Sequence, residues 1–246
     1  MTLYFTIPDA VPDWFAAVFR CAQARSGLPV RVVKGIPDRL KPLGDAILAA
    51  RQTPAEGPGM RRFCALGLLR WPVLLDAVKD LPASDWPVCC LDWDILVCTD
   101  FRPWLARFAQ FDYAITRDKH GESAGPYLLR DIRPLRTFCD ALQSAVENHS
   151  PVSAYTNDMH FWDLIRHLNA WNVGDMSVPQ DGSVFDHNYG EDSGRFTMDG
   201  DHKKIVFENG HPYFFDQTGA KIEVVALHAW SSFKQQIPSF MKQLGL

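Results

Sequence analysis

Apolar residues in this chain form short runs of strand length, which alternate with longer segments that have the spacing of helices. This alternation is typical of an α/β fold with a mostly parallel sheet flanked by helices. Gly27 is placed to end the first helix, and Pro72 predicts a break or kink in the third. The expected strands lie at residues 3–7, 29–33, 88–91 and 111–116, the expected helices at 14–25, 45–51, 61–79, 132–148 and 158–168, and a loop at 53–59.

The pattern changes near the end of the chain. Asn209-Gly210 stands between two apolar runs within residues 205–215, which predicts a β-hairpin. Residues 221–227 predict a further strand. We therefore expect a smaller β-rich C-terminal part, with residues 1–246 forming one domain.

Composition indicates an ordinary globular protein. Of the 246 residues, 47% are hydrophobic and 22% charged, and the net charge of -4 predicts no attraction to nucleic acid. No run of 18 apolar residues and no secretory signal is present, so no transmembrane segment is expected, while peripheral membrane contact stays open. The six cysteines lack metal-binding spacing, which favours free thiols in a reducing, cytoplasmic environment.

Two acids interrupt the apolar run Val-Cys-Cys-Leu-Asp-Trp-Asp-Ile-Leu-Val-Cys at residues 88–98. If this run is extended throughout, Asp92 and Asp94 point to one side and Trp93 to the other. A buried pair of carboxylates without compensating charge would be costly. The run therefore either ends at the surface with two solvated acids or holds a cation, and we favour a divalent cation bound to a diphosphate.

A second polar group, His228-Ala-Trp-Ser-Ser-Phe-Lys234, follows the strand expected at 221–227. His228 should lie at the carboxyl end of that strand, where open α/β sheets bind ligands. Its imidazole suits an ion such as Mn²⁺, and the carboxylates of Asp92 and Asp94 add hard oxygens. Lys234 offers a compact charge for a phosphate oxygen. Each residue alone could be an ordinary side chain, but together they indicate a metal and diphosphate site.

Both motifs resemble those of glycosyltransferases of the GT-A fold, which are metal-dependent enzymes that use nucleotide sugars. Leu-Asp92-Trp-Asp94-Ile-Leu-Val looks like their DxD motif. His228-x-x-Ser231-x-x-Lys234 is similar to the H-x-x-G-x-x-K motif of glycosyltransferase family 8, with Ser231 in place of the glycine. The resemblance implies a GT-A-like fold, Mn²⁺ (or Mg²⁺) bound by Asp92, Asp94 and His228, and a lysine that contacts the diphosphate. It also implies a UDP-sugar as the default donor and favours retention of anomeric configuration.

The resemblance extends to residues outside the two motifs. Family 8-like enzymes carry an arginine that contacts the nucleotide sugar, and Arg70, 22 residues before Asp92, is the candidate, with Arg62 behind it. The plainer alternative is an ion pair between Arg70 and an acid such as Asp76. If the resemblance holds, the donor is bound by Arg70, Asp92, Trp93, Asp94 and Lys234.

Asp158 opens one of the expected helices, in a region where GT-A enzymes often have an acid near the acceptor or the reacting sugar. We expect catalysis to depend on Asp158 and on Lys234, which stabilises the leaving diphosphate. In an inverting enzyme Asp158 would be the first suspect for the base. The alternative is that Asn157 or Asp158 caps the helix. Residues 186–188, Asp-His-Asn, form a third polar cluster with no assigned role.

The sequence is therefore expected to encode an enzyme that moves a sugar from a nucleotide-sugar donor to a hydroxyl of a glycan or other acceptor. A sugar-nucleotide pyrophosphorylase is a rival, but it should have a glycine-rich loop after the first strand, and residues 6–12 contain no glycine. The rival from another class is a non-catalytic protein of the same fold that binds a nucleotide, glycan or partner. The complete set of acids, histidine and lysine argues against it.

Overall fold

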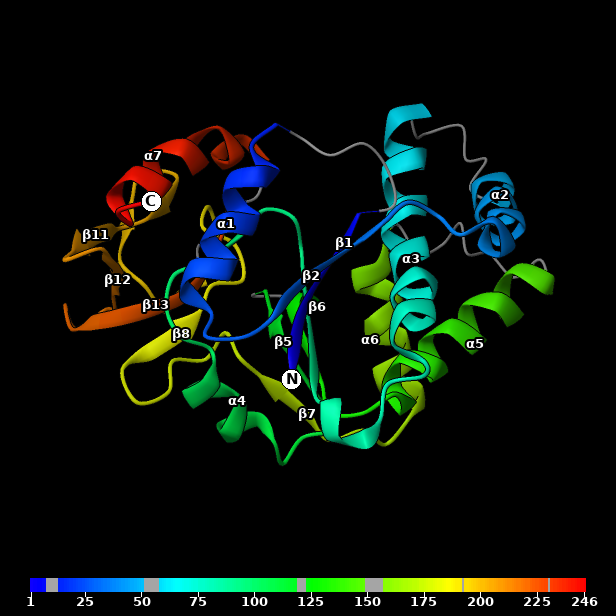
Figure 1. Cartoon of the computed structure of the whole chain (residues 1–246). Helices are drawn as coiled ribbons and strands as arrows, with labels where there is room; N and C mark the ends of the chain where they lie inside the picture. Colours follow the sequence, from blue (N-terminus) through cyan, green and yellow to red (C-terminus); the bar gives the residue numbers. More distant parts are fainter. Residues whose placement is uncertain (8–12, 51–57, 119–122, 149–156, 192, 230) are drawn as a thin grey trace.

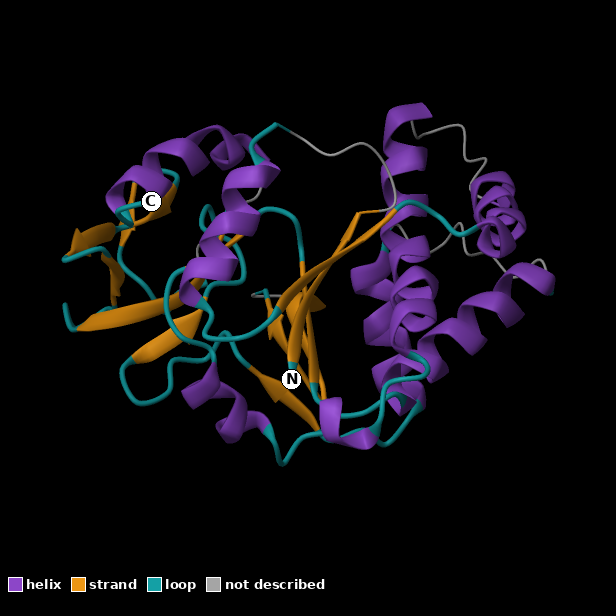
Figure 2. Cartoon of the chain, in the orientation of Figure 1, coloured by secondary structure: helices purple, strands orange, loops and turns teal. Residues whose placement is uncertain are grey.

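The computed structural model describes residues 1–7, 13–50, 58–118, 123–148, 157–191, 193–229 and 231–246. A six-stranded sheet crosses the centre of the molecule (Figures 1 and 2). Its strands are β1 (Thr2–Ile7), β2 (Val30–Lys34), β3 (Val88–Leu91), β5 (Tyr113–Arg117), β6 (Ser123–Leu129) and β7 (Val173–Asp175). They lie in the order β2-β1-β3-β6-β5-β7, and among them only β6 runs antiparallel to its neighbours. The expected mostly parallel α/β sheet is confirmed.

Alternating side chains divide the core between the two faces of this sheet. In β1, Leu3 and Phe5 belong to one buried cluster and Tyr4 to the other. One face is covered by α2 (Lys41–Ala50), α3 (Pro58–Val78), α5 (Arg133–Glu147) and α6 (Asp158–Leu168), and the other by α1 (Phe15–Arg25), α4 (Arg102–Phe108) and a second sheet (Figure 1). The shorter helices are η1 (Asp38–Leu40), η2 (Ala83–Asp85), η4 (Ser231–Gln236) and α7 (Ile237–Gln243).

The second sheet contains strands from three parts of the chain. Its strands, in spatial order, are β11 (Ile205–Glu208), β12 (His211–Phe215), β13 (Lys221–His228) and β4 (Ile95–Val97), with β8 (Ser183–Phe185) parallel to β13; β9 (Met198–Asp199) and β10 (His202–Lys203) pair separately. The predicted hairpin is confirmed, since Asn209 and Gly210 adopt φ angles of 52° and 77° between β11 and β12. The β-rich part is not only C-terminal, because β4 and β8 come from earlier segments. One buried cluster joins both sheets, from which we infer a single domain.

Most predicted elements occur close to their expected bounds, and the differences have local causes. Helix α2 begins earlier than predicted, at Lys41. Helix α3 begins at Pro58, so Pro58 and Gly59 are helical rather than part of a loop, while residues 51–57 lie outside the described part of the chain. Pro72 lies inside α3 without ending it. A proline in a helix costs about 3 kcal/mol, and the completely buried neighbours of Pro72 offset that cost through packing.

Several elements were not predicted, among them α4, the short strands β7 and β8, the helix α7 and the central strand β6. Pro126 argues against a central strand, because proline cannot donate to the hydrogen-bond ladder. The structure accommodates it where pairing is already interrupted. Pairing of β6 with β3 runs only to Cys90 opposite Tyr127, and its register with β5 shifts between Ile115 and Thr116.

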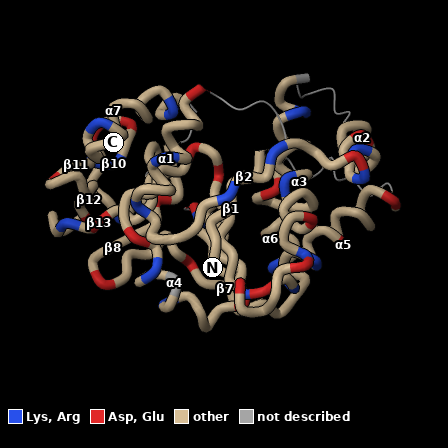
Figure 3. Tube along the Cα trace, in the orientation of Figure 1, with Lys and Arg blue, Asp and Glu red and all other residues tan. Residues whose placement is uncertain are grey.

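The surface and the thiols agree with the composition. All six cysteines are buried free thiols. Lys and Arg residues are intermingled with Asp and Glu along the trace (Figure 3). Among the described residues, no helix combines the length and the apolar character needed to cross a membrane.

Candidate metal and nucleotide site

The segment between β3 and β4 is a tight turn, in which the Ile95 N–H donates to the Asp92 carbonyl over 3.1 Å. The expectation of one extended run is wrong, because the chain leaves the central sheet after β3 and joins the second sheet as β4. Trp93 is among the residues that line one pocket with Asp92 and Asp94. Its ring packs edge-on against Trp14, with 6.4 Å between ring centroids. The turn, not the two-residue period of a strand, brings the acids together.

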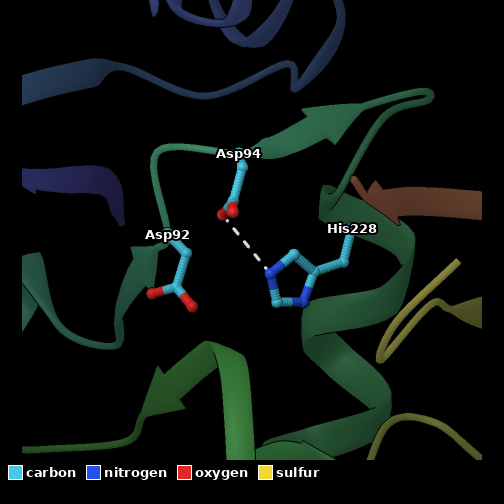
Figure 4. A group of neighbouring side chains, drawn as sticks. All are labelled: Asp92, Asp94 and His228. Atoms are coloured by element: carbon cyan, nitrogen blue, oxygen red, sulfur yellow. Dashed lines mark ion pairs between the residues drawn. The ribbon is translucent and has the colours of Figure 1, made fainter. Parts of the chain in front are cut away.

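Strand pairing brings His228 to these acids. β13 runs antiparallel to β4 with His228 opposite Ile95, and the Ala229 N–H donates to the Asp94 carbonyl over 3.0 Å. The His228 Nε2 lies 3.3 Å from the Asp94 Oδ1. Ligand atoms of Asp92, Asp94 and His228 all lie within 4.8 Å of one another. Figure 4 shows the three side chains, which converge from the turn and from the end of β13.

The loop after β8 holds His228 in this orientation. The His228 Nδ1–H donates to the carbonyl of His187, which directs Nε2 toward the acids. The His228 backbone N–H donates to the Asp186 carboxylate over 3.2 Å, and the Tyr189 N–H donates to the His228 carbonyl over 3.0 Å. Asp186 is completely buried and pairs with the Lys203 Nζ at 2.6 Å. A carbonyl that fixes one ring nitrogen leaves the other available as a metal ligand.

Positive charge surrounds Asp94. Besides His228, the Lys234 Nζ in η4 lies 2.9 Å from the Asp94 Oδ2. Burial favours a raised pKa for Asp94, but the charges and hydrogen bonds of His228 and Lys234 outweigh it and lower the pKa to about 2. Burial likewise opposes charge on His228, but Asp94 outweighs it and raises the pKa of the imidazole to about 9. In the metal-free protein, two side-chain cations therefore neutralise the carboxylate that a metal ion would bind.

Arg70 bridges two acids of the pocket. Its guanidinium pairs with Asp92 and, at 2.6 Å, with the Asp158 Oδ2, which also accepts the Trp71 indole N–H over 2.9 Å. The alternative partner Asp76 is wrong, because Asp76 pairs with two other basic side chains. Burial raises the pKa of Asp158, against the opposing charge of Arg70. The arginine predicted to bind the donor thus already holds two of the predicted site residues.

Two glycines leave room for these carboxylates. A Cβ atom at Gly67 would lie 3.0 Å from the Asp158 Oδ1, and one at Gly125 would lie 3.0 Å from the Asp92 Cγ. Neither glycine was a candidate from the sequence, because each lies in a different element from the acid that it accommodates. The hydrogen bonds by which Asp186 and His187 hold His228 were also not predicted, although both residues belong to the polar cluster at 186–188.

The pocket brings the predicted residues together. It is lined by Arg70, Asp92, Trp93, Asp94, Asp158, His228 and Lys234, with an apolar wall that includes Phe63, Leu66 and Met159. Arg62 is exposed and is not among its lining residues. Asn157, not Asp158, caps α6, since its side chain accepts the His160 N–H over 3.1 Å. Trp230, within the second motif, lies outside the described residues.

Comparisons with known proteins give a distant structural likeness. No protein-family model matches the chain, and no curated protein matches it. Solved structures do match, among them the galactosyltransferase LgtC in complex with donor and acceptor sugar analogues. The likeness covers 100% of this chain and 95% of LgtC, at 14% sequence identity and a TM-score of 0.49. At so low an identity, the chemistry must be argued from the site itself.

Proposed function

We propose that the chain is a metal-dependent glycosyltransferase of the GT-A type. It would move a sugar from a nucleotide-sugar donor, with UDP as the nucleotide, to a hydroxyl of a glycan or other acceptor, with retention of configuration. The observation that carries the proposal is the convergence of the Asp92–Asp94 turn with His228 and Lys234, from distant parts of the sequence, on one pocket. Metal ligands beside an ammonium group that lines the pocket suit a nucleoside diphosphate as leaving group.

The ligand set fits Mn²⁺ (or Mg²⁺). Two carboxylates supply hard oxygens, and an imidazole held with Nε2 toward them favours a transition ion. A divalent ion held by Asp92, Asp94 and His228 would supply Lewis-acid charge for the diphosphate. The same three side chains would fix the position of the donor through that charge.

Lys234 is the leaving-group residue of this proposal. Its side chain is 25% exposed and lines the pocket, and its ion pair among the described site acids is with the Asp94 Oδ2. An entering phosphate oxygen offers this ammonium group a second anionic partner. Negative charge grows on the diphosphate as the sugar departs, so the contact strengthens in the transition state and speeds transfer.

Arg70 and Asp158 would act around the reacting sugar. Because Arg70 is held by Asp92 and Asp158, it would position both acids. Its guanidinium would also attract the negatively charged donor. Asp158 would orient a hydroxyl of the acceptor or of the donor sugar. In an inverting reaction Asp158 would be the base, for which a raised pKa is suitable. Trp93 offers an aromatic ring beside the metal ligands.

The proposal is tested by the melting temperature with UDP, Mn²⁺ or both. Ligand at a hundred times Kd stabilises by about 2.7 kcal/mol, which corresponds to a rise of about 5–10 °C in a chain of this size. We expect UDP to cause this rise only when Mn²⁺ is present. Release of UDP from a panel of UDP-sugars then distinguishes a transferase from a non-catalytic binding protein.

Asp94→Asn is the informative variant, because it keeps the shape of the side chain and removes a negative charge from the metal site. Asp181→Asn is its control, since Asp181 is 78% exposed and pairs with Arg107 away from the pocket. UDP stabilisation that persists in EDTA, or is unchanged in Asp94→Asn, would contradict the metal site. Stabilisation without UDP release from any UDP-sugar would instead favour a non-catalytic protein.

A further inference from the structure

A second group of metal-ligating side chains lies next to the pocket described above. It consists of Asp118, which follows β5, and of His187 and Glu191, which follow β8. One ligand atom from each lies within 4.8 Å of the others. None of the three belongs to the proposed nucleotide site, so this group calls for a separate explanation.

The hydrogen bonds of His187 determine which ring nitrogen is available. The Thr116 hydroxyl donates its one hydrogen to the Gly125 carbonyl over 2.9 Å. The same oxygen therefore accepts the hydrogen bond from the His187 Nδ1, 3.3 Å away. In a neutral imidazole with hydrogen on Nδ1, Nε2 presents a lone pair. The His187 side chain is only 6% exposed, so solvent has little access to that nitrogen.

The lone pair of His187 faces negative charge. Its Nε2 lies 3.5 Å from the Glu191 Oε2, and Asp118 brings a second carboxylate to the same space. A lone pair and carboxylate oxygens at this separation repel one another unless a positive centre lies between them. A buried nitrogen aimed at two carboxylates is therefore an arrangement that a cation would stabilise.

Basic side chains near this group are the competing explanation. Arg117, Arg195 and Lys203 line a small cavity together with His187 and Glu191. Lys203 is held by Asp186 at 2.6 Å, and Arg195 donates to the Ser177 carbonyl over 3.1 Å. Lys203 is thereby paired outside the group, whereas the guanidinium groups of Arg117 and Arg195 keep further donors that can reach carboxylates. A count of bound ions is therefore the decisive measurement.

We propose that Asp118, His187 and Glu191 bind a second divalent transition-metal ion, such as Zn²⁺ or Mn²⁺, separate from the ion of the nucleotide site. One imidazole nitrogen with two carboxylate oxygens suits these ions better than Ca²⁺ or Mg²⁺, which prefer oxygen ligands alone. The ion would join the end of β5 to the loop after β8. It would thereby fix the His187 carbonyl that accepts the His228 Nδ1–H.

The test counts ions bound to the full chain. Protein is dialysed against Zn²⁺ or Mn²⁺ alone and analysed for metal by mass spectrometry, with Co²⁺ absorption as a second reading of the coordination. The parent should bind two ions. Glu191→Gln and Asp118→Asn should each lose one, and Asp94→Asn should lose the other. Glu223→Gln is the matched control, because Glu223 faces His211 at 3.2 Å without a third ligating side chain among the described residues.

The variants make the two sites separable. Loss of an outer partner of a metal ligand already weakens binding roughly 10–100-fold, so loss of a direct ligand should weaken it more. A parent that binds one ion, removed by Asp94→Asn but not by Glu191→Gln, would overturn the second site alone. Two ions retained in Glu191→Gln would overturn it as well. One ion removed only by Glu191→Gln would support this site and contradict the proposed nucleotide site. Circular dichroism of each variant without metal checks that the fold is kept.

Discussion

Replacing Lys234 with alanine separates the diphosphate contact from the metal ligands. Lys234 lies 2.9 Å from the Asp94 carboxylate and lines the pocket, so an entering phosphate can reach its ammonium group. A hydrogen bond to a charged group contributes roughly 1.5–3 kcal/mol. Its loss should weaken the affinity for UDP in the presence of Mn²⁺ about ten- to a hundredfold. Sugar transfer should slow further, because the contact strengthens as the leaving group gains charge.

The direction of the change in affinity for Mn²⁺ without UDP is the more specific part of this prediction. Because Lys234 neutralises Asp94, Lys234→Ala should bind Mn²⁺ alone as tightly as the parent or more tightly. His228→Ala should instead weaken Mn²⁺ and UDP together. Lys221→Ala is the control, since Lys221 is a half-exposed lysine that pairs with Glu208. It should change neither affinity.

Calorimetric titration with Mn²⁺, with UDP and with UDP in saturating Mn²⁺ measures all three quantities. If Lys234→Ala binds UDP and Mn²⁺ like the parent, Lys234 is only a counter-ion of Asp94. The leaving-group role would then be withdrawn, and the proposal would rest on the two acids and the histidine. A lower affinity for Mn²⁺ alone in Lys234→Ala would contradict the reasoning about competition for Asp94.

The candidate site could be predicted from sequence because its motifs lie at strand ends. The apolar runs that predict β3 and β13 stop at Asp92 and at His228. The two strands belong to different sheets, and the antiparallel pairing of β13 with β4, which follows the Asp92–Asp94 turn, brings their ends together. The detailed path was wrong, since the chain changes sheets between Asp92 and Asp94. The two carboxylates still lie close together, because a tight turn, like an extended strand, can bring two side chains to one side.

The contacts that the sequence did not predict are those of side chains with several possible partners. Arg70 could pair with any of several acids, and only the packing of α3 against β3 and α6 selects Asp92 and Asp158. The support of His228 by Asp186 likewise needs the position of the loop after β8. No short-range pattern encodes such contacts. Strand β6 was also not predicted, and its Pro126 lies where pairing with β3 has ended and the register with β5 shifts.

Three further predictions follow from buried groups around the site. Asp186→Asn leaves its buried lysine partner without a counter-charge, so denaturant titration should show a loss of roughly 3–5 kcal/mol; a loss below about 1 kcal/mol would contradict the pairing. Gly125→Ala would bring a Cβ atom 3.0 Å from the Asp92 Cγ, so Mn²⁺ affinity should fall while circular dichroism stays that of the parent; unchanged affinity would mean that Asp92 is not a ligand. The third concerns pH. Burial disfavours charge on His228, but Asp94 overrides it and raises the pKa from 6.5 to about 9. This raised pKa contributes stability that is fully present below pH 6.5 and is lost as the pH rises through about 9. The melting temperature of the metal-free protein should therefore fall across that range. Mn²⁺ needs the neutral imidazole, so its affinity should rise with pH over the same range, by up to tenfold per unit. Parallel melting curves and Mn²⁺ titrations between about pH 6.5 and 9 test both trends. A Mn²⁺ affinity that is independent of pH there would show that His228 gives up no proton on binding and is not a ligand.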